Sequence, residues 1–191
     1  VEVHAVGLNP IDYKTFEGAK PLRFLSFMTK LRKPSRWFES KSSLFPRGVG
    51  RDFAGVITEV GEGVSRFAVG DKVFGTMISD PGLGTKRGAE SEIVLKPDMI
   101  DMNHAATMGV ASLTVGGAFR KIELNSKDVV VISAASGGIG SIAVQYAVAK
   151  GATVIGIASK KNSEYLKSLG AIPVAYEENI QDALLSASPK P

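Results

Sequence analysis

The chain has 191 residues, of which 44% are hydrophobic and 22% are charged, and its formal net charge is +4. This composition is ordinary for a globular protein and is sufficient for one large domain or two small ones. The lack of cysteine excludes disulfides and thiolate metal ligands, and no apolar run approaches the ~18 residues that a membrane span needs. We therefore expect a cytoplasmic protein without a membrane partner.

The first half of the chain, to about residue 102, has the pattern of short strands joined by turns. Residues 1–6 alternate between apolar and polar side chains, as in a half-buried strand. Residues 56–60 predict a second strand, which a tight turn at residues 61–63 follows. The segments VGDKVFG and SEIVLKP predict two further strands. Short strands at such intervals are typical of a barrel or a sandwich.

Residues 20–47 are apolar, basic and interrupted by prolines, and Glu39 is their one acidic residue. They predict a helix or a long loop over the barrel. Within them, Arg36-Trp37-Phe38 alternates charge with aromatic rings, as single-stranded nucleic-acid surfaces do. A solvated segment with a packed Trp37 is the simpler interpretation, so we do not expect a nucleic-acid partner.

The second half changes to helical and buried-strand patterns. Residues 104–119 have helical spacing, and residues 128–133 form a continuous apolar run, as in a strand covered on both faces. A helix is predicted at residues 139–150 and a strand at residues 153–158, and a short helix follows at residues 163–169. Strand, helix and strand in this order predict a parallel crossover unit of a doubly wound sheet.

The turn after the first of these strands, AASGGIG, is our candidate cofactor site. Gly137 and Gly140 occupy the second and third glycine positions of the dinucleotide pattern G-x-G-x-x-G, and Ala135 stands in the first. A helix that starts there directs its free N–H groups at a pyrophosphate. The candidate cofactor-binding residues are Ala135, Ser136, Gly137, Gly138, Ile139 and Gly140. The alternative is a tight turn that binds nothing.

The end of the second strand indicates which cofactor binds. An NAD site has an acidic residue about 20 residues after the glycines. Here Ser159, Lys160 and Lys161 occupy that region, and the nearest acidic residue is Glu164. Hydroxyl and ammonium groups bind a 2′-phosphate, so we predict NADP(H), with Tyr176 closing over the adenosine side. The alternative is a pair of solvated lysines.

Five segments of the chain together resemble the zinc-independent, quinone oxidoreductase branch of the medium-chain dehydrogenase/reductase superfamily. They are GLNPIDYK, GRDFAGVITEVGEGVSRFAVGDKVFG, ASLTVGGAF, AASGGIG and LKSLGA, and they occur in one order. The resemblance implies an α/β plus β fold: a GroES-like barrel domain at residues 1–103 and a Rossmann domain at residues 104–191, with the active site in the cleft between them.

The resemblance also indicates which positions would hold a catalytic zinc ion. Zinc alcohol dehydrogenases of the superfamily use Cys, His and Cys as catalytic ligands, and the motifs place Asn9, Arg51 and Val110 at those positions. Zinc needs nitrogen, sulfur or carboxylate ligands in a tetrahedral arrangement. The only histidines are His4 and His104, which we interpret as structural. We therefore expect no metal site.

Without a metal, the resemblance implies hydride transfer from NADPH to a quinone or an α,β-unsaturated carbonyl compound, because these acceptors spread the negative charge onto a conjugated oxygen. It suggests Asn9 beside the nicotinamide ribose and the substrate, and Thr114 near the carboxamide. Tyr13 is a candidate proton donor or stacking wall. Asn9 and Thr114 have the alternative role of turn and helix-capping residues.

Two other functions remain open at this stage. One is reduction of an enoyl thioester by the same chemistry. The other is a catalytically weak NADPH-binding protein with a nucleic-acid-binding surface. The chain starts without methionine and ends soon after one complete crossover unit, so we expect a fragment of a longer protein. A homodimer of the full-length protein is left open.

Overall fold

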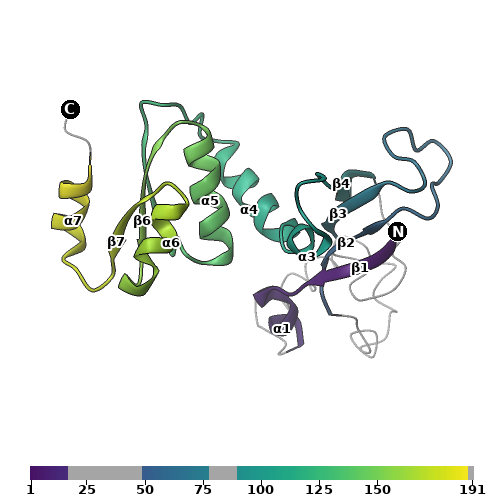
Figure 1. Cartoon of the computed structure of the whole chain (residues 1–191), viewed down its shortest axis with the longest axis horizontal. Coiled ribbons are helices and arrows are strands. Elements are labelled where there is room, and N and C mark those ends of the chain that lie inside the picture. Colours follow the sequence, from purple (N-terminus) through teal and green to yellow (C-terminus); the bar gives the residue numbers. More distant parts are fainter. Residues whose placement is uncertain (17–48, 78–89, 189–191) are drawn as a thin grey trace, which may run out of the picture. The chain divides into compact units, whose positions relative to one another are not determined.

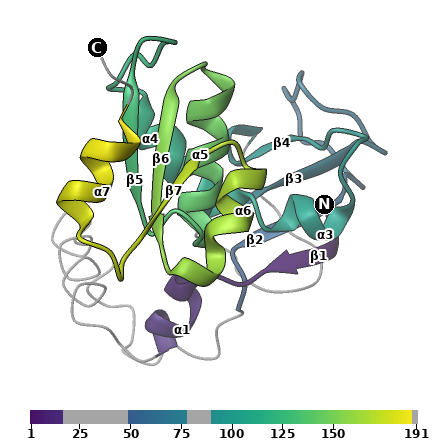
Figure 2. The ribbon, with the colours of Figure 1, turned by 60° about the vertical axis from the view of Figure 1, so that its left-hand side comes forward.

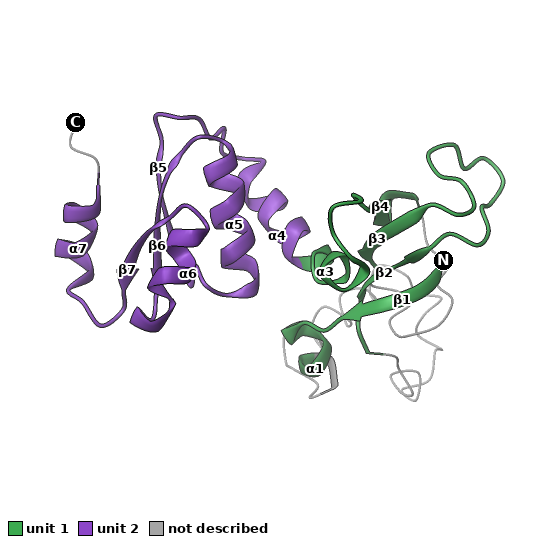
Figure 3. Cartoon of the chain, in the orientation of Figure 1, with its two compact units in different colours: residues 1–110 green, residues 111–191 purple. Residues whose placement is uncertain are grey.

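The computed structural model describes residues 1–16, 49–77 and 90–188. These residues form two compact units, residues 1–110 and 111–191, which we describe one at a time (Figure 3). The predicted domain boundary between residues 103 and 104 falls inside the first unit. Ala105 and Ala106, beyond that boundary, are buried against Ala54 in this unit. The boundary at 103/104 itself stays a prediction.

The first unit is built on a four-stranded antiparallel sheet (Figure 1). Its strands are β1 (Glu2–Gly7), β2 (Asp52–Val56), β3 (Lys72–Thr76) and β4 (Ile93–Leu95), in the order β1-β2-β3-β4. The predicted strand at residues 56–60 is wrong, since β2 ends at Val56. After it, the N–H of Ile57 donates to the carbonyl of Asp71 and closes the loop between β2 and β3.

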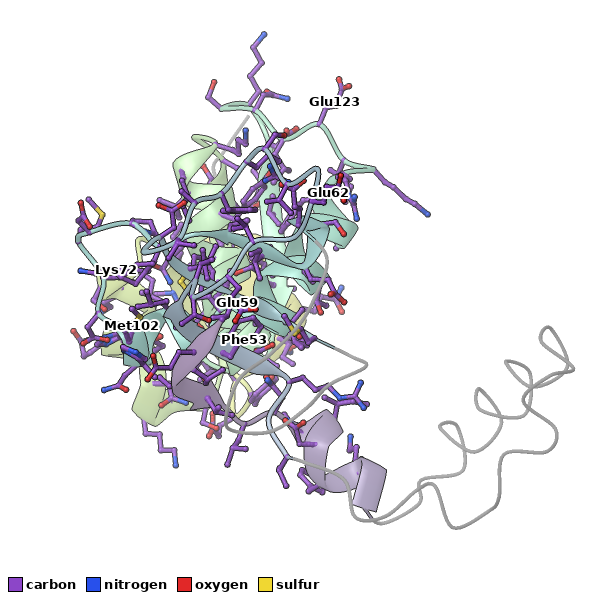
Figure 4. All side chains as sticks on the ribbon, turned by 90° about the vertical axis from the view of Figure 1, so that its right-hand side faces the viewer. Phe53, Glu59, Glu62, Lys72, Met102 and Glu123 are labelled. Carbon is purple, nitrogen blue, oxygen red and sulfur yellow. The ribbon has the colours of Figure 1, made fainter. Side chains whose placement is uncertain are left out.

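Strand β2 is buried on both faces. Phe53 is fully buried in one apolar cluster, with Val73 and Met77, and Figure 4 labels it among the side chains of this unit. Ala54 points to the other face, where the short helix α3 (Met102–Ala106) covers the sheet. The unit also contains α1 (Pro10–Phe16) and the single turn η3 (Glu90–Glu92). This packing explains why residues 52–56 form an apolar run with one charged member.

The second unit contains the predicted parallel crossover unit and a second one after it. Strands β5 (Val129–Ser133), β6 (Thr153–Ala158) and β7 (Ile172–Ala175) form a parallel sheet in the order β5-β6-β7. Helix α5 (Gly138–Ala149) connects the first two strands. The turn η4 (Lys160–Asn162) and helix α6 (Ser163–Ser168) connect the second and third. Helix α4 (Gly109–Phe119) precedes the sheet, and α7 (Ile180–Ala187) follows it.

The alternation of side chains along β6 sorts these helices onto two faces of the sheet. Val154 and Ala158 pack with the apolar side chains of α5 and α6, whereas Ile155 and Ile157 pack with those of α7. Figures 1 and 2 show α7 on the opposite side of the sheet from α5 and α6. The unit therefore has the three layers of a doubly wound fold.

Strand β5 differs from its prediction. It was expected to be covered on both faces, but the side chains of Val129 and Val131 are 43% and 49% exposed. Only its Ile132 face packs against the core, because the apolar side chains of α7 on the opposite face pack with β6 and β7. Within the described ranges, no helix is both long enough and apolar enough to cross a membrane.

Candidate cofactor and substrate sites

The carboxyl ends of the three parallel strands meet at one edge of the second unit's sheet. Ser133 pairs with Ile157, and Ala158 pairs with Ala175, so the segments that follow these strands lie at the same level. We call these segments, residues 134–140, 159–161 and 176–177, the carboxyl edge. Ligands of open α/β sheets bind at such edges. The fold thus brings together every residue predicted to bind the cofactor.

The glycine turn has little room for side chains on one side and open space on the other. A Cβ atom added at Gly140 would collide with the carbonyl oxygen of Ala134, so the start of α5 approaches the turn as only glycine allows. A Cβ added at Gly138 would meet no atom within 4 Å. Ala134 itself has a φ of 52°, in the left-handed region. The turn therefore packs tightly inward and leaves the start of α5 open outward.

The N-terminus of α5 fits a pyrophosphate. Its N-cap residue is Gly137, and no side chain caps the helix. Gly137, Gly138 and Ile139 are exposed, and the positive end of the helix dipole favours an anion there. Ala135 is different: it is fully buried, and its N–H donates to the carbonyl of Ile157 at 3.0 Å. Its side chain belongs to the core of the unit.

Two hydrogen bonds tie the glycine turn to the neighbouring strand ends. The Ser136 hydroxyl accepts from Nδ2 of Asn162 at 2.9 Å. The Tyr176 hydroxyl accepts from the N–H of Ala134 at 2.9 Å, while the Tyr176 side chain is 45% exposed. Sequence reasoning missed Asn162, because no spacing rule links it to a serine 26 residues earlier. Tyr176 is thus anchored on the turn with part of its ring in solvent.

A carboxylate also lies at the carboxyl edge. Lys160 and Lys161 are exposed. The backbone N–H of Lys160, however, donates to Oε2 of Glu177 at 3.2 Å. Glu164, the nearest acidic residue in sequence, instead forms an ion pair with Lys167 at 2.8 Å. The edge therefore mixes two ammonium groups with a carboxylate that only the sheet topology reveals.

In the first unit, Asn9 is held by two aspartates. Asn9 directly precedes α1, and its backbone N–H donates to Oδ2 of Asp12 at 2.8 Å. A carboxylate three residues after the start of a helix often accepts from the first backbone group in this way, and proline suits the first helical position. The sequence N-P-x-D carried this signal. The Asn9 side chain reaches the second aspartate: its Nδ2 donates to Oδ2 of Asp52 at 2.9 Å.

Asp52 is fully buried at the start of β2. Its two carboxylate oxygens accept from the backbone N–H of Val110 at 2.9 and 3.0 Å. A Cβ at Gly109 would lie 2.8 Å from the Asp52 carboxyl carbon, so glycine there allows α4 to start against this group. Burial raises the pKa of Asp52 above the ordinary 3.8, while the hydrogen bonds from Val110 and Asn9 oppose that shift.

The three positions that the family resemblance matches to zinc ligands all contact these aspartates. Asn9 and Val110 donate to Asp52, and Nε of Arg51 lies 3.9 Å from Oδ1 of the buried Asp12. We call these five residues the Asp52 network. In the described ranges, no three or more His, Asp or Glu side chains form a group that could hold a metal ion.

The remaining candidates lie apart from these contacts. Tyr13 is 53% exposed on α1, and Thr114 is exposed on α4. His4 is exposed on β1, and His104 Nδ1 lies 2.9 Å from Oδ1 of Asp101, which caps α3. The roles of Tyr13 and Thr114 stay predictions. The basic segment at residues 20–47, with Arg36-Trp37-Phe38, lies outside the described residues.

Comparison with known proteins places the chain in a family. The model of the alcohol dehydrogenase GroES-like domain matches residues 1–134. The chain is 31% identical over 204 residues to the mitochondrial NAD(P)H oxidoreductase RTN4IP1 of Homo sapiens, with 99% of this chain and 49% of that protein covered. It is 31% identical to the chloroplast envelope quinone oxidoreductase homolog of Arabidopsis thaliana, with 98% of this chain and 54% of that protein covered. The chain spans about half the length of these curated relatives.

Solved structures agree. The quinone oxidoreductase of Coxiella burnetii is 35% identical with a TM-score of 0.72, and 98% of this chain matches 56% of that one. The CurK enoyl reductase is 30% identical with a TM-score of 0.71, for 97% of this chain and 54% of that one. The Escherichia coli quinone oxidoreductase, complexed with NADPH, is 28% identical with a TM-score of 0.66, for 97% and 52%.

The fold prediction is therefore confirmed: a GroES-like domain is followed by a parallel sheet of the Rossmann type. The chain belongs to the family of the alcohol dehydrogenase GroES-like domain, in the quinone oxidoreductase branch of the medium-chain dehydrogenase/reductase superfamily.

Proposed function

We propose that the protein is an NADPH-dependent oxidoreductase that transfers hydride to a quinone or an α,β-unsaturated carbonyl compound without zinc. The observation that carries this proposal is the uncapped N-terminus of α5, which lies at the carboxyl edge. Lys160 and Lys161 lie at the same edge, just after the end of β6. The similarity to a quinone oxidoreductase complexed with NADPH supports it.

The cofactor residues have distinct proposed roles. The backbone N–H groups of Gly138 and Ile139 would hold the pyrophosphate, because the first N–H groups of a helix are free to donate. The N–H of Gly137 donates instead to the carbonyl of Ala134 at 2.9 Å. Ser159 and Lys160, with Lys161 in support, would bind the 2′-phosphate through charge-assisted hydrogen bonds. The exposed part of Tyr176 would contact the adenosine. When bound, NADPH supplies the hydride, and the protein supplies position and electrostatics.

In the first unit, we propose that the Asp52 network takes the place of a metal site. Zinc prefers thiolate, imidazole and carboxylate ligands, whereas Asn9, Arg51 and Val110 offer an amide, a cation and an apolar side chain. Because a carboxylate only accepts hydrogen bonds, the Asn9 amide must present Nδ2 to Asp52. Its Oδ1 is then left to accept from a ribose hydroxyl or from the substrate. Asp52 is thus a positioning residue for Asn9.

The proposed class of acceptor follows from the residues at the three zinc-ligand positions, which do not suit a Lewis-acid metal. Hydride addition to a simple ketone builds charge on one oxygen, which a metal would stabilise. Addition to a quinone or to the β-carbon of an enone spreads this charge by conjugation, so positioning and exclusion of water can suffice. Tyr13 is the proposed proton donor or stacking wall, and Thr114 is the proposed contact to the carboxamide.

A substrate panel tests this proposal. Purified full-length protein with NADPH should reduce a benzoquinone and a simple enone, and it should oxidise a saturated alcohol with NADP⁺ far more slowly. Dialysis against a chelator should leave quinone reduction unchanged. Efficient alcohol oxidation, or activity that is lost with stoichiometric zinc, would contradict the proposal.

One observation favours a second candidate. The similarity to the CurK enoyl reductase supports reduction of an enoyl thioester by the same hydride chemistry. Including a crotonyl-CoA-type substrate in the panel separates the two: preference for the thioester over quinone and enone would select the second candidate. The cytoplasmic location and the homodimer stay predictions.

A further inference from the structure

The carboxyl edge carries a carboxylate in the region proposed for the 2′-phosphate. Glu177 follows β7 directly, next to Tyr176, and β7 is the parallel neighbour of β6. Its Oε2 accepts from the backbone N–H of Lys160 at 3.2 Å. Backbone N–H groups at such a position are donors that a bound phosphate would use. The negatively charged Glu177 side chain therefore occupies one of these backbone donors, the N–H of Lys160.

The charges around Glu177 do not neutralise it by direct pairing. Among the described residues, its carboxylate has no ion pair within 4.0 Å. Lys160 and Lys161 are exposed on the neighbouring segment, and Glu164 is paired with Lys167 on α6. The next residue, Glu178, is also exposed, and its backbone N–H donates to the carbonyl of Ala175.

We infer that Glu177 is a specificity-determining residue that opposes the two lysines and lets the protein use NADH beside NADPH. A 2′-phosphate carries nearly two negative charges at neutral pH, so a carboxylate at the Lys160 N–H repels it. The same carboxylate can accept from the ribose hydroxyls of NADH, the role that an acidic residue after the second strand has in NAD sites. Glu177 supplies this carboxylate from the third strand instead.

This inference rests on the proposed binding of NADP(H) at the carboxyl edge. Its test is direct binding by calorimetry, with NADPH, NADH, adenosine 2′,5′-bisphosphate and AMP as ligands of the full-length protein. The substitution Glu177→Gln keeps the shape and an acceptor oxygen but removes the charge. The matched control is Glu178→Gln, which makes the same change in charge on the neighbouring residue.

In the wild type, the dissociation constants of NADPH and NADH should differ by no more than about tenfold. Removing one like charge near a solvated phosphate should strengthen NADPH and adenosine 2′,5′-bisphosphate binding by about fivefold. NADH and AMP binding should weaken by about twofold, because a neutral amide is the weaker acceptor. The preference for NADPH, expressed as the NADH dissociation constant divided by that of NADPH, therefore rises by about tenfold in Glu177→Gln. In Glu178→Gln it changes by less than about twofold.

The possible failures can be told apart. If NADPH binds but its preference over NADH is unchanged in Glu177→Gln, or changes equally in Glu178→Gln, the role of Glu177 is overturned and the proposed cofactor stands. If the wild type binds none of the four ligands, the proposed cofactor site is overturned, and the inference with it.

Discussion

The Asp52 network and the carboxyl edge are both polar, but they differ in burial. Asp52 and Asp12 are 0% and 5% exposed, and their oxygens are bonded to backbone and side-chain donors that fix Asn9. At the carboxyl edge, Lys160, Lys161 and Glu177 are exposed, and the Glu177 carboxylate accepts from the Lys160 N–H at the longer distance of 3.2 Å. Buried groups fix a geometry and affect stability, whereas exposed groups tune the affinity for a charged ligand.

The largest expected effect comes from the part of the carboxyl edge that is itself buried. Gly140→Ala places a Cβ against the carbonyl oxygen of Ala134, and backbone atoms cannot move away cheaply. We expect a loss of about 3 kcal/mol in the free energy of unfolding, measured by urea denaturation. The matched control is Gly138→Ala, where a Cβ meets no atom within 4 Å.

Gly138→Ala should leave stability unchanged or raise it by up to about 1 kcal/mol, because alanine favours a helix. Its new methyl group nevertheless lies on the open side of the turn, so NADPH binding should weaken. Equal destabilisation by both substitutions would show that the two sides of the turn do not differ in packing.

The second effect concerns Asp52. Asp52→Ala leaves the N–H of Val110 and Nδ2 of Asn9 without their acceptor in a partly buried place, which should cost about 2 kcal/mol of unfolding free energy. Asp52→Asn retains one acceptor oxygen and should cost less. Quinone reduction should fall in both variants, since Asn9 loses the partner that orients it.

The pH dependence of stability provides a separate check on Asp52. Because its pKa is raised in the folded state, the folded protein binds a proton more readily than the unfolded chain. Its contribution to stability is therefore full below 3.8 and is lost as the pH rises through the raised pKa. As the pH rises from 3.8 through the raised pKa of Asp52, the free energy of unfolding of the wild type should therefore fall relative to that of Asp52→Asn. A relative gain would contradict the buried, desolvated state of this carboxylate.

The smallest effect is expected at the exposed lysines. Lys160→Glu removes one attraction to the 2′-phosphate and adds one repulsion, so NADPH affinity should fall by about tenfold, or about 1.4 kcal/mol. NADH affinity should hardly change or should improve. The matched control, Lys127→Glu, makes the same charge change before β5, at the opposite end of the strand from the glycine turn. If the ratio of NADPH to NADH affinity changes equally in Lys160→Glu and Lys127→Glu, Lys160 acts only through the general charge of the protein and does not bind the 2′-phosphate.

The sequence allowed most of the parallel sheet to be predicted, because long apolar runs and a periodic helix identify their own elements. The strand at residues 153–158 and the helix after the glycine turn were confirmed almost to the residue. The strand at residues 56–60 was misplaced, since β2 starts with the charged Asp52, which the pattern of apolar residues could not assign to a strand.

The contacts between distant segments could not be predicted in the same way. Asn9 was selected from the family motif, but its bond to Asp52 joins residues 43 positions apart. Glu177 lies 17 residues after Lys160 and meets it only because β6 and β7 are parallel neighbours. A lone carboxylate in an apolar strand was a signal for Asp52. For Glu177, the only signal was its place immediately after a strand end.

The measurement that tests the account most directly is quinone reduction by NADPH with full-length protein freed of metal by chelation. Hydride transfer is followed by the loss of NADPH absorbance, with metal content determined on the same sample. We predict an undiminished rate in the metal-free wild type and a strongly reduced rate in metal-free Asp52→Asn, with NADPH binding retained. A wild-type rate that disappears with the metal and returns when zinc is added would contradict it.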